Sequence, residues 1–194
     1  MKTKIVAGLG NPGKEYENTP HSIGFEVVRS LAAELGFEWE QKKAYKCLMA
    51  RGIFGGMNLI LVQPMTFMNL SGEAVAPVVS YSNATAADLI VVQDDIDLAS
   101  GRLRIRKSGS CGGHNGVRNI IERLGSSAFA RVKIGVGKER GNVIGHVLGK
   151  FDVATRQVMD KTVAKAVEEV KVALSEGCDA AMNKFNGWKI EEET

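Results

Sequence analysis

His21 and Asp94 are the residues of this sequence whose types are best suited to proton transfer. A neutral imidazole can take a proton from water, and a carboxylate can orient the ring through its other nitrogen. His21 directly follows Thr19-Pro20, which is typical of an N-cap and first turn of a helix, and a helix N-terminus favours the neutral ring. We therefore predict a general base, His21, oriented by Asp94, with Asp95 and Asp97 as alternative acids.

Three asparagines in separate loop-like segments are candidates for holding a substrate: Asn11, Asn69 and Asn115. An amide N–H can stabilise a carbonyl oxygen on which negative charge develops. Met68, next to Asn69, adds an apolar surface for a base or a side chain. Two structural interpretations stay open, because Asn115 could cap the helix that follows it and Met68 could fill the core.

Other catalytic chemistries find less support in the motifs. The segment 8–13 matches G-x-G-x-x-G, but no helix is predicted to open there and no acidic residue follows at the distance of a dinucleotide site. Cys111 and His114 have zinc-ligand spacing, but the other Cys and His residues are remote. A Gly-x-Ser-x-Gly nucleophile motif is missing. We therefore expect no cofactor, no metal and no serine nucleophile.

Basic residues are concentrated in one block of the chain. Residues 101–150 carry 11 Lys and Arg against 2 Asp and Glu, whereas residues 1–100 carry 8 against 11. Arg102, Arg104 and Arg106 alternate with apolar residues, so on a strand they point to one side. Arg131 and Lys133 repeat this spacing. The pattern predicts a cationic stripe for a nucleic acid or polyphosphate, although a solvated face that improves solubility is the alternative.

The elements that position these residues follow from the hydrophobic pattern. Strands are predicted at 4–9, 46–53, 57–63, 89–93, 101–107 and 131–136. Helices are predicted at 20–35, 72–81, 117–124, 152–176 and 178–185. This order mixes βα units with hairpins, so we expect an α/β fold in which a single domain, 1–194, forms a twisted mixed β-sheet with helices on both faces.

Composition limits the class of protein. The chain of 194 residues is 44% hydrophobic and 24% charged, with a net charge of +3, which favours a soluble globular protein over a disordered one. The sequence contains no run of 18 apolar residues, so we expect no membrane span. Its three cysteines are odd in number and widely spaced, which favours a reducing cytoplasm over a disulfide framework.

Four segments, in order along nearly the whole chain, resemble the bacterial peptidyl-tRNA hydrolase family: Gly8–His21, Thr66–Gly72, Asp94–Leu98 and Gly112–Gly116. Two positions depart from the pattern. Family members often have glycine or histidine where this chain has Ser110-Cys111, and another residue where it has Pro20.

The resemblance implies a monomeric, cytosolic, metal-free esterase that cleaves the ester between a peptide and the 3′ ribose of tRNA. It implies that His21 is catalytic, with Asp94 as its partner. The remaining implied site residues are the asparagines Asn11, Asn69 and Asn115, Tyr16 at the tRNA end, Met68 in the site wall, and Arg104, Arg106 and Lys133 at the tRNA phosphates. Residues 137–145 could form a mobile lid. A non-catalytic RNA-binding protein with the same fold is an alternative.

Overall fold

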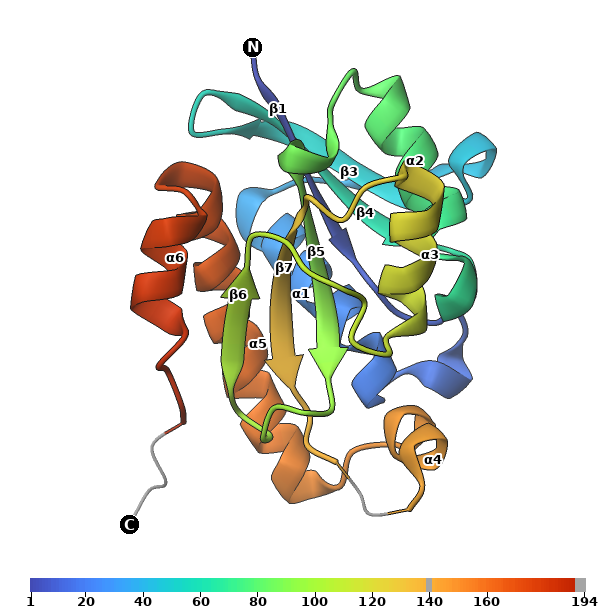
Figure 1. Ribbon diagram of the computed structural model, residues 1–194, viewed down its shortest axis with the longest axis vertical. Coiled ribbons are helices and arrows are strands. Elements are labelled where there is room, and N and C mark those ends of the chain that lie inside the picture. Colours follow the sequence, from blue (N-terminus) through green and yellow to red (C-terminus); the bar gives the residue numbers. More distant parts are fainter. Residues whose placement is uncertain (139–140, 191–194) are drawn as a thin grey trace.

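The computed structural model describes residues 1–138 and 141–190, and within them seven strands form one sheet (Figure 1). The strand order across the sheet is β2-β3-β4-β1-β5-β7-β6. The strands are β1 (Thr3–Gly8), β2 (Trp39–Lys42), β3 (Cys47–Phe54), β4 (Met57–Pro64), β5 (Leu89–Asp95), β6 (Leu103–Arg106) and β7 (Ala130–Gly135).

The four central strands, β4, β1, β5 and β7, run parallel to one another. In this register Ala7 of β1 lies between Val62 of β4 and Val91 of β5. These strands are mostly apolar because helices bury both faces of the sheet. Strands β3 and β6 pair antiparallel with the outer members of this group. The parallel arrangement brings the carboxyl ends of the four central strands to one edge, where ligand sites of open α/β sheets lie.

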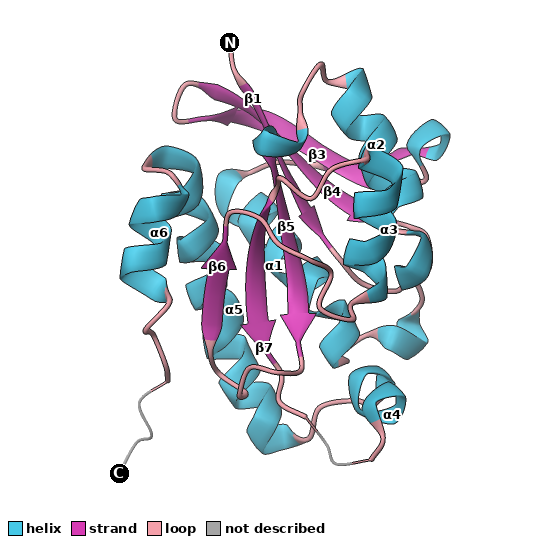
Figure 2. Cartoon of the chain, in the orientation of Figure 1, coloured by secondary structure: helices cyan, strands magenta, loops and turns pink. Residues whose placement is uncertain are grey.

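Helices cover both faces of the sheet (Figure 2). One core contains residues of α1 (Ile23–Leu35), α5 (Val153–Ser175) and α6 (Cys178–Phe185), and the other contains residues of α2 (Gly72–Tyr81) and α3 (Asn115–Leu124). Helix α4 (Val143–Leu148) lies beyond the carboxyl ends of β5 and β7. No helix in the described ranges is long and apolar enough to cross a bilayer.

Most predicted elements are confirmed, including the mixed sheet and the two-sided helix layers. Helix α1 ends at Gly36, whose left-handed φ of 68° closes the last turn. Asp152 caps α5 by accepting a hydrogen bond from the N–H of Thr155, as predicted. Strand β2 was not predicted, because its four residues at the sheet edge are largely polar and show no alternation.

Two predicted helix starts are wrong in detail. His21 lies in a short 3-10 helix, η2 (Pro20–Ser22), and α1 begins only at Ile23. Thr19 occupies the N-cap position of this turn, with Pro20 as its first residue, as predicted, but its side chain forms no cap bond, since its hydroxyl donates to the carbonyl of Tyr16 at 2.7 Å. Asn115 is not a cap either, because it is the first residue of α3.

Candidate active site

Three loops meet at the carboxyl edge of the sheet, next to the last residues of β5. The first follows β1 and includes η1 (Lys14–Tyr16) and η2, and the second follows β4 and includes η4 (Met68–Leu70). The third is the glycine-rich segment that precedes α3. The first two loops leave this edge, and the third follows β6 from the opposite edge and reaches the carboxyl edge where α3 begins.

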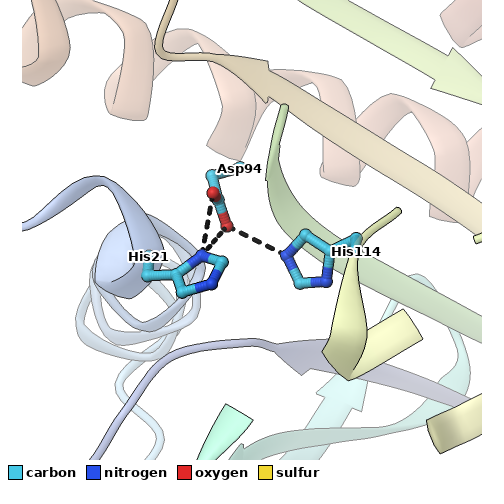
Figure 3. Close-up of side chains that lie close together, drawn as sticks. All are labelled: His21, Asp94 and His114. Atoms are coloured by element: carbon cyan, nitrogen blue, oxygen red, sulfur yellow. Dashed lines mark hydrogen bonds and ion pairs between the residues drawn. The ribbon is translucent and has the colours of Figure 1, made fainter. Parts of the chain in front are cut away.

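Asp94 forms hydrogen bonds with two histidines from different loops (Figure 3). Nδ1 of His21 lies 2.9 Å from both carboxylate oxygens of Asp94, and Nε2 of His114 lies 3.0 Å from Oδ1. The predicted pair of His21 and Asp94 is therefore present in the structure. His114 was not predicted as a partner, because the sequence does not show that the start of α3 faces the end of β5.

The hydrogen bonds show which nitrogen of each histidine ring carries the proton. His114 is the N-cap of α3, and its Nδ1 accepts the N–H of Val117 at 3.3 Å. The proton of its neutral ring is therefore on Nε2, which donates to Asp94. His21 likewise donates to the carboxylate from Nδ1, which leaves Nε2, on the other side of its ring, as a proton acceptor. The arrangement prepares His21 to act as a base.

Asp94 is buried and nevertheless remains charged. Its side chain is 2% exposed. Burial alone would raise the pKa of Asp94, but the hydrogen bonds of His114 and His21, together with the positive charge of these rings in their protonated form, outweigh burial and hold this pKa well below the usual range. An ionised carboxylate at this place also stabilises the positive charge that His21 acquires when it takes a proton.

The same three side chains are close enough to raise the question of a metal ion, since one ligand atom of each lies within 4.8 Å of the others. A metal would need an unprotonated Nε2 on His114. The hydrogen bond from Val117 occupies the lone pair of Nδ1 and so requires the proton at Nε2. The donor set therefore fits a hydrogen-bonded histidine–aspartate–histidine cluster rather than a metal site.

The glycines of the first loop serve packing rather than nucleotide binding. A Cβ on Gly8 would lie 2.1 Å from the carbonyl oxygen of Gly24 in α1, and one on Gly10 would meet the ring of Phe25. Gly24 itself lies against Leu9 in the same way. These contacts bring α1 onto the end of β1, so close packing explains the glycines at positions 8 and 10 of the G-x-G-x-x-G match.

Asn11 and Met68 are joined by a hydrogen bond between the first two loops. The backbone N–H of Met68 donates to Oδ1 of Asn11 at 2.7 Å, and both residues are buried. A Cβ on Gly116 would lie 2.5 Å from Sδ of Met68, so glycine at this position lets the first turn of α3, which directly follows the third loop, pack on the second loop. Tyr16 stands edge to face with Phe67, with ring centroids 6.4 Å apart. Predicted site residues thus connect all three loops.

The other two asparagines lie at the surface. Asn69 is exposed in η4. Asn115 is exposed at the start of α3 and accepts a hydrogen bond from Arg118 at 3.2 Å. Asn11, by contrast, lines a cavity of about 510 Å³ together with Ser22 and Met65.

A cavity of about 190 Å³ contains the catalytic candidates. The polar residues of its wall include His21, Asp94, His114 and Asn115. Helix α4 contributes the apolar residues Val143, Ile144 and Val147 to the same wall. Val143 and Ile144 are exposed, so α4 presents apolar groups at this cavity. The predicted lid overlaps the start of α4, but residues 139–140 of that stretch lie outside the described residues.

Asp95 and Asp97 do not contact His21. Asp95 forms an ion pair with Lys133 at 3.1 Å and accepts the N–H of Asp97 at 2.8 Å. Asp97 is exposed and lies 3.8 Å from Lys138. Among the three acids at this strand end, Asp94 is therefore the one bonded to the base, and Lys133 is held at the cavity by Asp95.

The exposure predicted for the basic side chains of the cationic stripe is confirmed on β6 and wrong for Arg131 on β7. Leu103 and Ile105 are buried while Arg104 and Arg106 are exposed, as the alternation predicted. Arg104 lies opposite Lys133, and Arg106 opposite Arg131. Arg131 is only 1% exposed, because its guanidinium turns inward over the ring of Phe129 and donates to the carbonyl of Gly109.

Comparisons with known proteins agree with these motifs. A family model described as peptidyl-tRNA hydrolase matches residues 5–193. The peptidyl-tRNA hydrolase of Caldanaerobacter subterraneus subsp. tengcongensis is 48% identical over 184 residues, which cover 94% of this chain and 99% of the relative. That of Thermoanaerobacter sp. (strain X514) is 46% identical over 183 residues, with 94% and 99% covered.

Solved structures give the same result. A crystal structure of peptidyl-tRNA hydrolase from Acinetobacter baumannii is similar with a TM-score of 0.91 at 33% identity, and the match covers 96% of each chain. The matched 96% of this chain includes most of the sheet and helices that position His21, Asp94 and His114. Sequence and architecture therefore lead to one conclusion: the chain belongs to the peptidyl-tRNA hydrolase family of enzymes.

Proposed function

We propose that this chain hydrolyses the ester bond between a peptide, or an N-blocked amino acid, and the 3′ ribose of tRNA, and so returns free tRNA to translation. Family membership supports the reaction class. The observation that carries the mechanism is the hydrogen bond between Nδ1 of His21 and the buried carboxylate of Asp94, in the wall of a cavity. Incubation with N-acetylaminoacyl-tRNA tests the proposal: release of the acyl group supports it, and an intact ester on bound tRNA overturns it.

In this mechanism His21 takes up one proton from water and later gives it to the leaving ribose oxygen. Nε2 of His21 takes a proton from water while the water oxygen attacks the ester carbonyl carbon. The tetrahedral intermediate then collapses, the bond to the ribose oxygen breaks, and His21 returns the proton to that oxygen. Asp94 holds the Nδ1–H throughout and stabilises the transient imidazolium. The products are a carboxylic acid and the 3′ end of tRNA, and the sequence of steps needs no metal and no covalent intermediate.

Asparagine side chains hold the substrate in this proposal. The oxygen of Asn11 is occupied by the N–H of Met68, so its amide can offer N–H groups to a carbonyl oxygen. Asn115, which is exposed and lines the cavity of His21, binds the substrate there in this proposal, and the exposed Asn69 binds a part of the substrate outside this cavity. One donor to a developing oxyanion contributes about 3 kcal/mol. Met68 forms part of the wall, and Tyr16 with its neighbour Phe67 offers aromatic surface to the unpaired end of tRNA.

Arg104, Arg106 and Lys133 bind tRNA phosphates in this proposal. Arg104 and Arg106 are exposed, and within the described ranges neither forms a salt bridge, whereas Lys133 is paired with Asp95. We also propose that the chain acts as a cytoplasmic monomer of one domain, and that the described parts of the predicted lid, residues 137–138 and 141–145, move over the cavity. Equal hydrogen-exchange protection of this stretch and of the core strands would contradict the last point.

Reversing the charge of the stripe is expected to weaken tRNA binding without removing the chemistry. The double variant Arg104→Glu, Arg106→Glu should raise KM at least 10-fold at low salt and leave kcat nearly unchanged, because it touches neither His21 nor Asp94. The slope of log Kd against log salt should fall by about 2 for tRNA. The exposed Arg51 on β3 supplies the matched control, Arg51→Glu. An unchanged slope in the double variant would show that the stripe does not meet phosphate.

His114→Asn separates the two roles of His114. Asparagine keeps the N-cap of α3, since it is among the best capping residues, but it loses the hydrogen bond to Asp94. A hydrogen bond to a charged group contributes about 1.5–3 kcal/mol to stability, so we expect the free energy of unfolding to fall by about this amount. We expect kcat to fall by about 10-fold, because Asp94 loses one of the two groups that position it. Steady-state kinetics beside thermal unfolding checks this. Full activity would show that His21 alone is sufficient to orient Asp94.

A further inference from the structure

Cys111 lies in the wall of the reaction cavity, and the proposed mechanism does not use it. Cys111 is partly exposed, and its backbone carbonyl accepts the N–H of His114 at 2.9 Å. The thiol is thus on the turn that carries a histidine bonded to Asp94. A group attached to this sulfur would enter the cavity of about 190 Å³ that His21 and Asp94 also line.

Positive groups surround this sulfur. The backbone N–H of Gly113 is the largest cause that lowers the pKa of the Cys111 thiol. Burial raises this pKa and partly offsets that effect, and the hydrogen bond and charge of Arg118 lower it further. Cys111 also stands just before the N-terminus of the ten-residue helix α3, where the helix dipole favours a negative charge. These surroundings lower the pKa of the thiol and so favour the thiolate, the form that attacks a disulfide.

Arg131 supplies an independent sign of a negative partner at this turn. It is 1% exposed, and its Nε and Nη1 have no hydrogen-bond partner in the described part of the chain. Its Nη2 donates at 2.6 Å to the carbonyl of Gly109, two residues before Cys111, and its Nη1 would lie 3.5 Å from a Cβ on Gly109. The guanidinium is therefore directed at the Gly109–Cys111 turn.

A buried guanidinium without a carboxylate is costly unless another anion compensates it. Among the described residues Arg131 forms no salt bridge, but it interacts electrostatically with Cys111. Burial lowers the pKa of Arg131, and the negative charge of Cys111 raises it. The negative group that acts on the charge of Arg131 is thus the thiolate of Cys111, although among the described residues no hydrogen bond joins the two side chains.

We propose that Cys111 is a modification site, at which the sulfur exchanges with anionic low-molecular-weight disulfides, and that the attached group blocks the cavity. The Cys111 thiolate attacks one sulfur of the disulfide, a new S–S bond to Cys111 forms, the original S–S bond breaks, and the second sulfur leaves as a thiolate. The basic block around the turn attracts an anionic disulfide. A dithiol reverses the step by the same exchange.

The other two cysteines provide internal controls. Cys47 is buried, and burial raises its pKa to about 11. Burial also raises the pKa of Cys178. Neither lines the cavity of His21. One chain therefore contains one activated thiol and two that should react slowly.

The test uses dithiobis(nitrobenzoate), an anionic aromatic disulfide whose leaving thiolate is coloured, on the intact native protein at pH 7. We expect one thiol per chain to react at least 10-fold faster than the other two, and this phase to be lost in Cys111→Ala. Arg118→Gln should slow the phase. For the wild type, the pH at which the fast phase reaches half its maximum rate should lie below the value for the same chain unfolded in denaturant. This comparison separates activation of the thiol from mere exposure.

The activity arm rests on the proposed function, whereas the labelling arm does not. Esterase activity of the wild type should fall in parallel with the fast phase and return with dithiothreitol, while whatever activity Cys111→Ala has should resist the reagent. A fast phase that persists in Cys111→Ala, or a midpoint at or above that of the unfolded chain, would overturn the activated thiol. Full activity after complete labelling would overturn the block. An untreated protein without esterase activity would refute the proposed function alone.

Discussion

Replacing His21 by alanine is expected to lower kcat for N-acetylaminoacyl-tRNA by about 10²–10⁴-fold, the range of a lost general base. The ring is held by Asp94 at 2.9 Å, and no other histidine of the cavity has a nitrogen available for water, because both nitrogens of His114 are occupied by Val117 and Asp94. The affinity for tRNA should change little, since phosphate binding is assigned to other residues.

The matched control is His146→Ala. His146 is in α4, and its Nε2 lies 3.1 Å from the carbonyl of Val136 rather than near Asp94. Its kcat should stay within a few-fold of the wild type. A comparable loss in both variants would mean that the fall reflects damage to the fold around the cavity and not the loss of a base.

Asp94→Asn should lower kcat by about 10³-fold with the backbone unchanged. In the native protein one carboxylate accepts protons from Nδ1 of His21 and Nε2 of His114. Asparagine has one oxygen and one NH2 group, so it can accept from one ring but must donate to the other. Because the cap bond from Val117 keeps the proton of His114 on Nε2, His21 is the ring that changes tautomer. Its Nε2 then carries a proton and can no longer accept one.

The neighbouring carboxylate offers the control for this variant. Asp95 contacts Lys133 and not the histidines, so Asp95→Asn should retain kcat within about 10-fold and act mainly on KM for tRNA. Equal losses in the two variants would contradict the assignment of Asp94 as the orienting acid.

The depressed pKa of Asp94 also predicts an acid dependence of stability. A carboxyl group with a lower pKa in the folded state contributes stability above its unfolded pKa, about 3.9, and loses it as the pH falls toward the folded value. The difference in unfolding free energy between the wild type and Asp94→Asn should therefore be largest near neutral pH and shrink below about pH 4. Denaturant titrations at pH 7 and pH 3 measure it.

The fold was largely predictable because local signals agree with the tertiary structure. Glycine ends α1, Asp152 begins α5, and the alternation of Leu103 to Arg106 gives the exposed face of β6. Strand β2 escaped prediction because it is short, polar and at the sheet edge, so that its pairing with β3 decides its conformation.

The site was predictable in its residue types and less so in its contacts. His21 and Asp94 could be paired because both belong to segments at the carboxyl edge of the sheet. The second histidine could not, because His114 acts as a cap and as a partner of Asp94 only after α3 is placed beside β5. Arg131 was assigned to the surface because strand alternation does not reveal that the glycine-rich turn covers it.

The most direct measurement of the central claim is single-turnover release of N-acetylated amino acid from tRNA, with EDTA present, by the wild type and by His21→Ala. The account predicts that the wild type cleaves in EDTA at an undiminished rate and that His21→Ala binds the same tRNA but releases the acyl group at least 10²-fold more slowly. Cleavage by both proteins at the same rate would contradict His21 as the base. Binding of tRNA by the wild type without any release would contradict the enzyme itself and leave an RNA-binding protein on this fold.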